Sequence, residues 1–129
     1  MLPAHRQCIE ELRGVLSHRR SVLGPDADGK LLALCLSSRR NMCVNKEVMD
    51  ASDRERVDGL CHKMTARWVR DQPGAKTCAY YEGCEGALEK LDSVLPEGVH
   101  SLADLRRLGA AEGWCPYFMA RQKLKSRDF

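Results

Sequence analysis

Four cysteines in distinctive local sequences are the residues of this chain best suited to metal chemistry. Cys43, Cys61, Cys78 and Cys115 are separated by 17, 16 and 36 residues. Such wide spacing means that the thiols come from separate elements, which must converge in space. Thiolates are soft ligands that hold iron–sulfur clusters in sets of four, and they also bind zinc. The four thiols can therefore form the corners of one iron–sulfur cluster.

Two alternatives to a cluster are compatible with the same cysteines. Structural zinc sites usually contain cysteines separated by about two to four residues, whereas the nearest pair here, Cys78 and Cys84, has five residues between them. The other alternative is simple packing, because free cysteine is among the most buried residue types. Cys8 and Cys35 fit that interpretation. Cys84 is ambiguous, since it can also replace Cys78 as a ligand.

The composition indicates one globular domain with a modest core. Of its 129 residues, 43% are hydrophobic, 30% are charged and 5% are aromatic. The net charge of +3 says little, but basic runs such as residues 39–40 and 106–107 are compatible with a nucleic-acid surface as well as with solvated helix faces. No signal peptide or membrane-spanning run is recognisable, so we expect an intracellular protein with reduced thiols.

The first part of the chain is expected to deliver Cys43 through a rigid turn. Residues 4–20 carry an apolar stripe at helical spacing, which predicts an amphipathic helix with Cys8 on its apolar face. Residues 31–36 are continuously apolar, as in a buried strand or the start of a core segment. Residues 37–41 are rich in side chains that bond to local backbone groups, and they lead directly into Cys43.

The strongest predicted helix spans residues 53–71 and carries Cys61. Its apolar stripe includes Cys61 and Trp68, so the sulfur of Cys61 is expected to point inward. Cys78 follows in a short aromatic segment. Residues 85–94 are then expected to form another helix, which a turn separates from the last part of the chain.

The last part of the chain contains two helix-start signals. Ser101 and Asp104 have the spacing of a capping box, and Gly109 and Gly113 are expected to break the helix that they begin. Pro116 fits the first turn of a final helix, where its missing N–H costs nothing. Cys115 directly precedes this turn, so free backbone N–H groups favour its anionic form.

The local sequences around the cysteines carry more information than their spacing. They read LSSRRNMCVNKEV at residues 36–48, VDGLC at 57–61, CAYYE at 78–82, LRRLG at 105–109 and GWCPYFMAR at 113–121. In this order they closely resemble the iron–sulfur domain of the xeroderma pigmentosum group D (XPD) family of helicases. The similarity covers residues 5–121, so we expect one domain over residues 1–129 with a divergent polar tail at 122–129.

The resemblance implies a mainly α fold. The expected structure is a small helical domain that binds a 4Fe-4S cluster, can include one short strand, and is inserted in a RecA-like motor domain of a superfamily 2 helicase. By position, the resemblance implies cluster ligation by Cys43, Cys61, Cys78 and Cys115, a place beside the cluster for Arg39, and contact with DNA for Tyr117 and Arg121.

The resemblance also implies the setting in which the domain works. The parent protein would be an ATP-dependent 5′-to-3′ DNA helicase of TFIIH, the factor of transcription initiation and nucleotide excision repair. It would act in the nucleus on single-stranded or forked DNA, with other TFIIH subunits and no membrane. ATP and Mg would bind in motor domains whose motifs are absent from these residues. We therefore expect a fragment that by itself neither hydrolyses ATP nor unwinds DNA.

Two further functional classes stay open at the level of sequence. One is a structural or protein-interaction module that zinc or packing stabilises without a cluster. The other is a metal-free helical fragment that does not fold alone. If a metal is bound, its binding and the folding of the converging segments are expected to be coupled.

Overall fold

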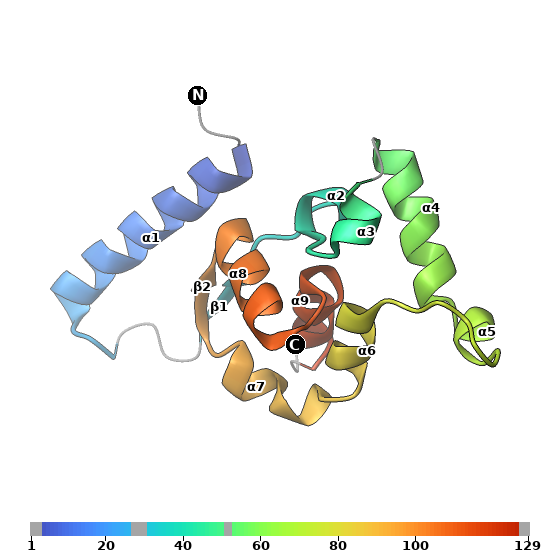
Figure 1. Ribbon diagram of the computed structural model, residues 1–129. Helices are drawn as coiled ribbons and strands as arrows, with labels where there is room; N and C mark the ends of the chain where they lie inside the picture. The colour runs from blue at the N-terminus through green and yellow to red at the C-terminus, as the bar shows by residue number, and fades with distance from the viewer. Residues whose placement is uncertain (1–3, 27–30, 51–52, 127–129) are drawn as a thin grey trace.

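The structure, a computed structural model, describes residues 4–26, 31–50 and 53–126. The elements are, in order, α1 (Ala4–Leu23), β1 (Leu32–Leu34), α2 (Arg39–Met42), α3 (Lys46–Met49), α4 (Arg54–Thr65), α5 (Arg67–Arg70), α6 (Ala79–Glu85), the 3-10 helix η1 (Leu88–Lys90), α7 (Leu91–Val94), β2 (Gly98–His100), α8 (Leu102–Glu112) and α9 (Pro116–Lys125). The predicted mainly α fold is confirmed (Figure 1). The first residues of the expected polar tail continue α9, and 127–129 lie outside the described residues.

A short parallel sheet joins two segments that are far apart in the sequence. β1 pairs with β2 so that Leu32 lies opposite Gly98 and Leu34 opposite His100. The apolar run at residues 31–36 therefore contains a strand, although the strand residues are only partly buried. The sequence predicts only a turn before β2, because three residues are too few to show a strand's period of two.

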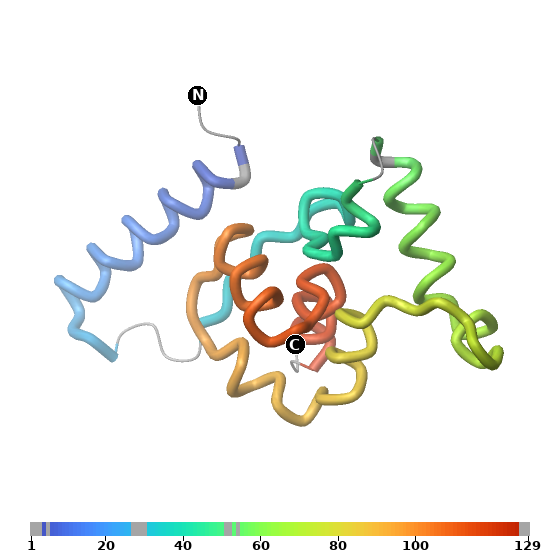
Figure 2. Tube along the Cα trace, in the orientation of Figure 1, coloured from blue at the N-terminus to red at the C-terminus, as the bar shows by residue number. Residues whose placement is uncertain are grey.

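The first helix lies along one side of the molecule, apart from the helices around α9 (Figures 1 and 2). Ile9 and Leu16 are buried, but Val15 is 63% exposed and Cys8 is exposed. The prediction of a buried Cys8 is therefore wrong. The helix itself is confirmed, but it buries only one edge of its apolar stripe.

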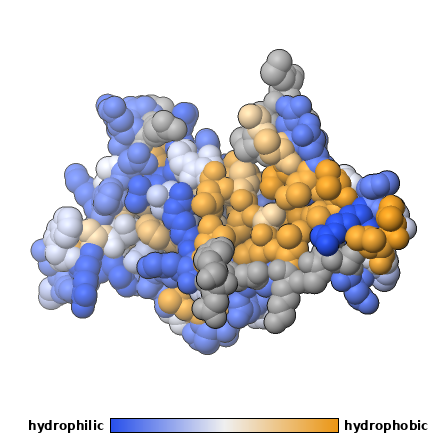
Figure 3. All heavy atoms as spheres, turned by 180° about the vertical axis from the view of Figure 1, so that it is seen from behind, coloured by the Kyte–Doolittle hydropathy of each residue, from blue (hydrophilic) through white to orange (hydrophobic). Residues whose placement is uncertain are grey.

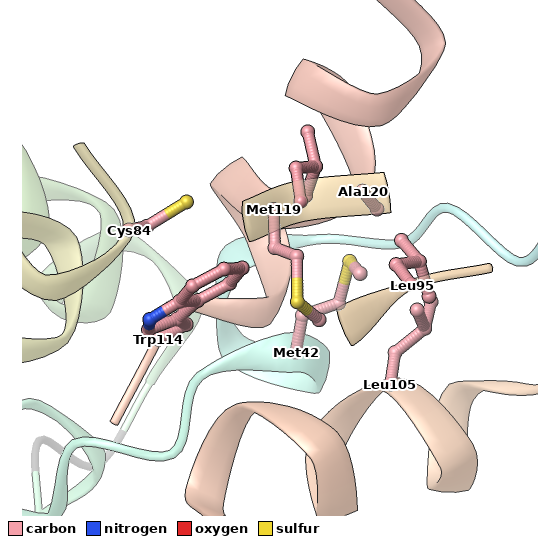
Figure 4. Packing of buried hydrophobic residues seen from close by; sticks show 8 residues of the cluster. Met42, Cys84, Leu95, Leu105, Trp114, Met119 and Ala120 are labelled. Atoms are coloured by element: carbon pink, nitrogen blue, oxygen red, sulfur yellow. The ribbon is translucent and has the colours of Figure 1, made fainter. Parts of the chain in front are cut away.

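The main core lies where α8 and α9 meet the end of α2 and the segment around α7. Figure 4 shows the packing of Met42, Leu95, Leu105 and Met119, all of which are fully buried. The cluster also contains Cys84, Leu91, Trp114 and Ala120. This core holds the N-terminal end of α9, and with it Cys115, in place.

Gly109 lies inside α8 and does not end it, contrary to the prediction. A Cβ at Gly109 would lie 2.6 Å from the carbonyl oxygen of Trp114 and 2.6 Å from Cγ of Pro116. The glycine therefore serves the close approach of α8 to the start of α9. The helix ends at Gly113, as predicted, where a φ of 74° is left-handed and suits glycine.

Two helices replace the single helix predicted for residues 53–71. Ala66, with a ψ of 134°, separates α4 from α5. The break changes the direction of the apolar stripe, so Trp68 is 70% exposed and the prediction that it is buried is wrong. The helix predicted for residues 85–94 is likewise divided into η1 and α7, and Leu88 is exposed.

A second core cluster beside α4 consists of Val48, Val57, Met64 and Cys78.

One face of the molecule carries a broad apolar surface. Figure 3 shows apolar side chains gathered over much of the face seen from behind. Val22 and Leu23 of α1 are about two-thirds exposed, at 66% and 65%. None of the helices in the described residues has the length and hydropathy needed to cross a membrane.

Candidate metal centre

Cys43, Cys61, Cys78 and Cys115 line one small cavity of about 20 Å³. Cys43 ends α2, Cys61 lies within α4, and Cys78 and Cys115 directly precede α6 and α9. The structure thus brings together the four thiols that the sequence singles out. Their role as metal ligands stays a prediction. The remaining lining residues are Arg39, Val48, Val57, Thr65, Tyr81, Tyr117 and Phe118.

A hydrogen-bonded turn positions Cys43. The Ser38 side chain accepts a hydrogen bond from the Asn41 backbone N–H at 3.3 Å, and Asn41 Nδ2 donates to Ser37 Oγ at 2.8 Å. The backbone N–H of Cys43 then donates to the carbonyl of Arg39 at 2.7 Å. The rigid turn predicted for residues 37–41 is confirmed, and the capped first turn of α2 brings Arg39 and Cys43 to the same cavity.

Asn45 connects two of the thiols, and the sequence reasoning missed it. Its Nδ2 donates to Sγ of Cys78 at 3.3 Å, while its Oδ1 accepts from the backbone N–H of Glu47 at 3.1 Å. The Cys43 thiol also lies 3.9 Å from the Asn45 carbonyl. Asn45 is only 8% exposed. The one signal in the sequence is an N-cap residue type two positions after a cysteine.

Backbone hydrogen bonds hold the other two segments at the cavity. The N–H of Cys78 donates to the carbonyl of Met64 at 3.4 Å, which ties the start of α6 to α4. The N–H of Cys115 donates to the carbonyl of Tyr80 at 2.9 Å, which ties the start of α9 to α6. The four cysteines therefore lie on segments that are already linked to one another.

Burial controls the protonation of the thiols. It raises the pKa of the Cys115 thiol to about 12, although the backbone N–H groups of Phe118 and Tyr117 oppose the increase. Burial also raises the pKa of Cys43 and of Cys61. These thiols are therefore protonated near neutral pH, and a metal would displace their protons on binding.

The thiols also influence one another. Beyond the effect of burial, ionisation of Cys61 or Cys78 would raise the pKa of both Cys43 and Cys115 further. Four thiolates placed together would repel one another strongly, so their anionic form needs positive charge at the same place.

Arg39 lines the same cavity, and its place beside a metal centre stays a prediction. Burial raises the pKa of Cys61, and the Arg39 guanidinium opposes that increase through its charge and a hydrogen bond. The guanidinium also lies 4.6 Å from the centroid of the Tyr117 ring. Arg39 Nε is buried and has no hydrogen-bond partner among the described residues. A buried donor without an acceptor is costly, so this N–H is available to an anionic group in the cavity.

Tyr117 and Arg121, the residues matched to DNA contact, touch each other on α9. The Arg121 guanidinium lies 3.6 Å from the Tyr117 ring centroid, and Arg121 Nη1 donates to the Tyr117 carbonyl at 3.1 Å. Arg121 Nη2 also approaches the carbonyl of Ser37 at 3.4 Å. Both side chains are half-buried. Tyr117 thus lies between the cysteine cavity and Arg121, and contact with DNA stays a prediction.

The remaining cysteines lie elsewhere. Cys84 is fully buried in the main core beside Trp114 (Figure 4) and does not line the cavity. The structure therefore does not place Cys84 where it could replace Cys78. Burial raises the pKa of Cys84 to about 11. Cys35 is buried next to β1, as predicted, and Cys8 is exposed on α1.

The donor types at the cavity suit an anionic iron–sulfur group, whose binding stays a prediction. Four thiols supply a complete ligand set, and Arg39 Nε offers an unpaired donor beside them. Within residues 4–26, 31–50 and 53–126, no three His, Cys, Asp or Glu side chains are close enough to hold one metal ion.

Comparison with known proteins identifies relatives along nearly the whole chain. The DEAD_2 family matches residues 3–129. The chain is 44% identical over 121 residues to "General transcription and DNA repair factor IIH helicase subunit XPD" of Arabidopsis thaliana, which covers 91% of this chain and 15% of that protein. The protein of the same name in Dictyostelium discoideum is 37% identical over 123 residues, covering 95% of this chain and 15% of that protein.

A further relative carries a different helicase name. "ATP-dependent DNA helicase chl1" of Neosartorya fischeri is 30% identical over 109 residues, which cover 80% of this chain and 12% of that protein. The chain thus spans about 15% or less of the length of these relatives.

Proposed function

Because the chain belongs to the DEAD_2 family of XPD-type helicases, we propose that it forms the iron–sulfur, DNA-binding domain of such a helicase. Cys43, Cys61, Cys78 and Cys115 bind a 4Fe-4S cluster. The observation that carries this proposal is the convergence of four thiols from four separate segments on one cavity.

Each residue at the cavity has a distinct part in holding the cluster. The four thiolates would be its ligands. A bound cluster would therefore link the end of α2, the middle of α4 and the starts of α6 and α9. The Arg39 guanidinium and the backbone N–H groups of Tyr117 and Phe118 offset negative charge. Asn45 Nδ2 orients the Cys78 sulfur by hydrogen bonding.

Tyr117 and Arg121 bind single-stranded DNA beside the cluster. A tyrosine ring can stack on a base, and an arginine can hold a phosphate or stack beside the ring. The contacts of Arg39 and Arg121 with the Tyr117 ring fix the position of that ring. The site therefore combines an aromatic ring with positive charge, which suits binding that does not depend on base sequence.

The parent protein acts as an ATP-dependent 5′-to-3′ DNA helicase in transcription and nucleotide excision repair. It works in the nucleus on forked DNA with other subunits of TFIIH. ATP and Mg bind in its motor domains. The names of the two XPD relatives support this assignment, since both describe a helicase subunit of the general transcription and DNA repair factor IIH.

The iron content of single-cysteine variants tests the ligand assignment. Cys61→Ser should lose most of its iron and sulfide after anaerobic purification, because one corner of the cluster is removed. Coupled loss of structure should appear as weakened protection of the Cys78 and Cys115 segments in hydrogen exchange.

Cys8→Ser is the matched control, because Cys8 is exposed on α1 and does not line the cysteine cavity. It should keep the iron content of the unsubstituted chain. A Cys61→Ser protein that retains full iron, or that folds completely without iron, would contradict the assignment or the coupling, respectively.

A further inference from the structure

Trp68 is an unusual surface residue. It is 70% exposed on α5, whereas the chain's other tryptophan, Trp114, is 4% exposed in the core. Exposure of a large aromatic side chain is unfavourable in water, and such side chains are typical of surfaces that bind a partner. No part of the proposed cluster site uses Trp68, since it does not line the cysteine cavity.

The helix that carries Trp68 is firmly held. Arg70 Nε and Nη2 donate to the two carboxylate oxygens of Glu82 at 2.6 and 2.9 Å. The same guanidinium lies 4.8 Å from the centroid of the Tyr81 ring. A bidentate pair combined with stacking fixes the last turn of α5 against α6. The indole is therefore presented at a defined position at the side of the molecule, where Figure 1 shows α5.

Charged side chains line two hollows at α5, the helix that carries the indole. On one side of α5, a hollow of about 520 Å³ is lined by Thr65, Arg67, Arg70, Asp71, Tyr81 and Glu82. A second hollow of about 430 Å³ adjoins Val69 and includes Lys63 and Lys76.

Most of the acidic groups at these hollows are already neutralised. Glu82 is paired with Arg70, and Glu47 is paired with Lys76 at 3.0 Å. Arg67 and Lys63, by contrast, form no ion pair within the described residues. The two hollows together have one more basic than acidic side chain, and Arg67 directly precedes Trp68 in α5.

We propose that Trp68 and Arg67 form a contact site for single-stranded nucleic acid, with the indole stacked on a base and the guanidinium bound to a phosphate. An exposed aromatic ring flanked by unpaired cations is the combination that binds single strands without base specificity. The proposal rests on the proposed function only for the identity of the ligand.

A continuous row of rings and guanidinium groups connects this site with Tyr117. Arg70 stacks on Tyr81, the Tyr81 and Phe118 ring centroids are 4.7 Å apart, and those of Phe118 and Tyr117 are 5.1 Å apart. The two candidate DNA contacts are thus attached to one rigid framework. A strand that engages both would be bound more tightly than one that engages either alone.

The two tryptophans allow a direct test. Oligothymidylate should quench the emission of the exposed Trp68 in the anaerobically purified chain, while the buried Trp114 should stay shielded. In Trp68→Phe the quenching should disappear although binding persists, because phenylalanine can still stack. Anisotropy of a labelled oligothymidylate should show that Trp68→Ala weakens binding by about 5- to 100-fold.

Two substitutions serve as matched controls. Val15→Ala removes another exposed apolar side chain, on α1, and Lys90→Ala removes another exposed cation. Both should bind as the unsubstituted chain does. Arg67→Ala should weaken binding several-fold. The slope of log affinity against log salt concentration should also become shallower by about one, the value for one lost phosphate contact.

The outcomes separate this proposal from the proposed function. Unchanged affinity in Trp68→Ala, with binding still sensitive to Arg121, would overturn the α5 site alone. No binding of oligothymidylate by the iron-loaded chain would overturn both. Equal losses in Trp68→Ala and Val15→Ala would also overturn the α5 site, because the effect would then not be specific to the indole.

Discussion

At the scale of single residues, Arg39 connects the proposed metal site with the proposed DNA surface. Its guanidinium acts on the Cys61 thiol and lies 4.6 Å from the Tyr117 ring, which in turn contacts Arg121. One cation thus serves an anionic site on one side and an aromatic ring on the other. The stack explains why these side chains are half-buried.

Replacing Arg121 tests the DNA surface without removing a cluster ligand. Arg121→Glu should weaken the binding of oligothymidylate by at least about tenfold, because a cation next to Tyr117 becomes an anion. The iron content should not change. Binding is measured by anisotropy, and iron by chemical analysis of the same sample.

The control for this charge change lies on the same helix. Lys125→Glu alters the charge equally at an exposed position near the end of α9. It should weaken binding far less than Arg121→Glu does. Similar losses in the two variants would indicate a general electrostatic effect and would count against a specific role for Arg121.

The sequence identified these residues with uneven success. The four cysteines and Arg39 stand in distinctive local sequences, so their convergence on one cavity could be expected. Asn45 could not, because its contact with Cys78 joins residues 33 positions apart. Trp68 was misplaced because its periodicity continues smoothly through Ala66, where the backbone leaves the helix.

At the scale of elements, the N-terminal end of α8 joins three parts of the molecule. Ser101 and Asp104 form the predicted capping box. Asp104 Oδ2 also accepts a hydrogen bond from Arg13 of α1 at 2.6 Å, and Arg13 Nη2 donates to the Val99 carbonyl of β2 at 3.3 Å. The capping box was predictable because its partners are three residues apart. The contact between Arg13 and Asp104 joins residues 91 positions apart, so no local sequence pattern could predict it.

This junction predicts a dependence of stability on pH. Partial burial tends to raise the pKa of Asp104, but hydrogen bonds from Ser101 and Arg13 outweigh it and lower the pKa to about 2. Because the folded pKa lies below the unfolded value of 3.8, the ionised carboxylate stabilises the fold above about pH 4. That contribution is lost as the pH falls from about 4 to about 2.

Urea unfolding at several pH values measures the effect. Asp104→Asn should cost about 1 kcal/mol near neutral pH, allowing for the partial exposure of the carboxylate, and the difference from the unsubstituted chain should shrink as the pH approaches 2. A difference that stays constant over this range would show that the charge of Asp104 does not stabilise the junction.

At the scale of the whole molecule, the core and the cysteine cavity are built by the same segments. α9 fills the main core with Met119 and starts at Cys115, and α4 fills the second core cluster with Val57 and carries Cys61. The mainly α class followed from the family resemblance, and the longer helices α1, α4 and α8 from periodicity and capping signals, whereas the short helices α2, α3 and α6 were not predicted. The sheet and the breaks within two predicted helices did not, because they depend on contacts between distant segments.

The measurement that tests this account most directly is an absorption spectrum of the anaerobically purified chain, with iron, zinc and sulfide analysis of the same sample. We predict a broad band near roughly 400 nm, with iron and sulfide in equal amounts and little zinc. A folded, colourless protein that holds zinc or no metal would contradict the assignment of Cys43, Cys61, Cys78 and Cys115 as ligands of an iron–sulfur cluster.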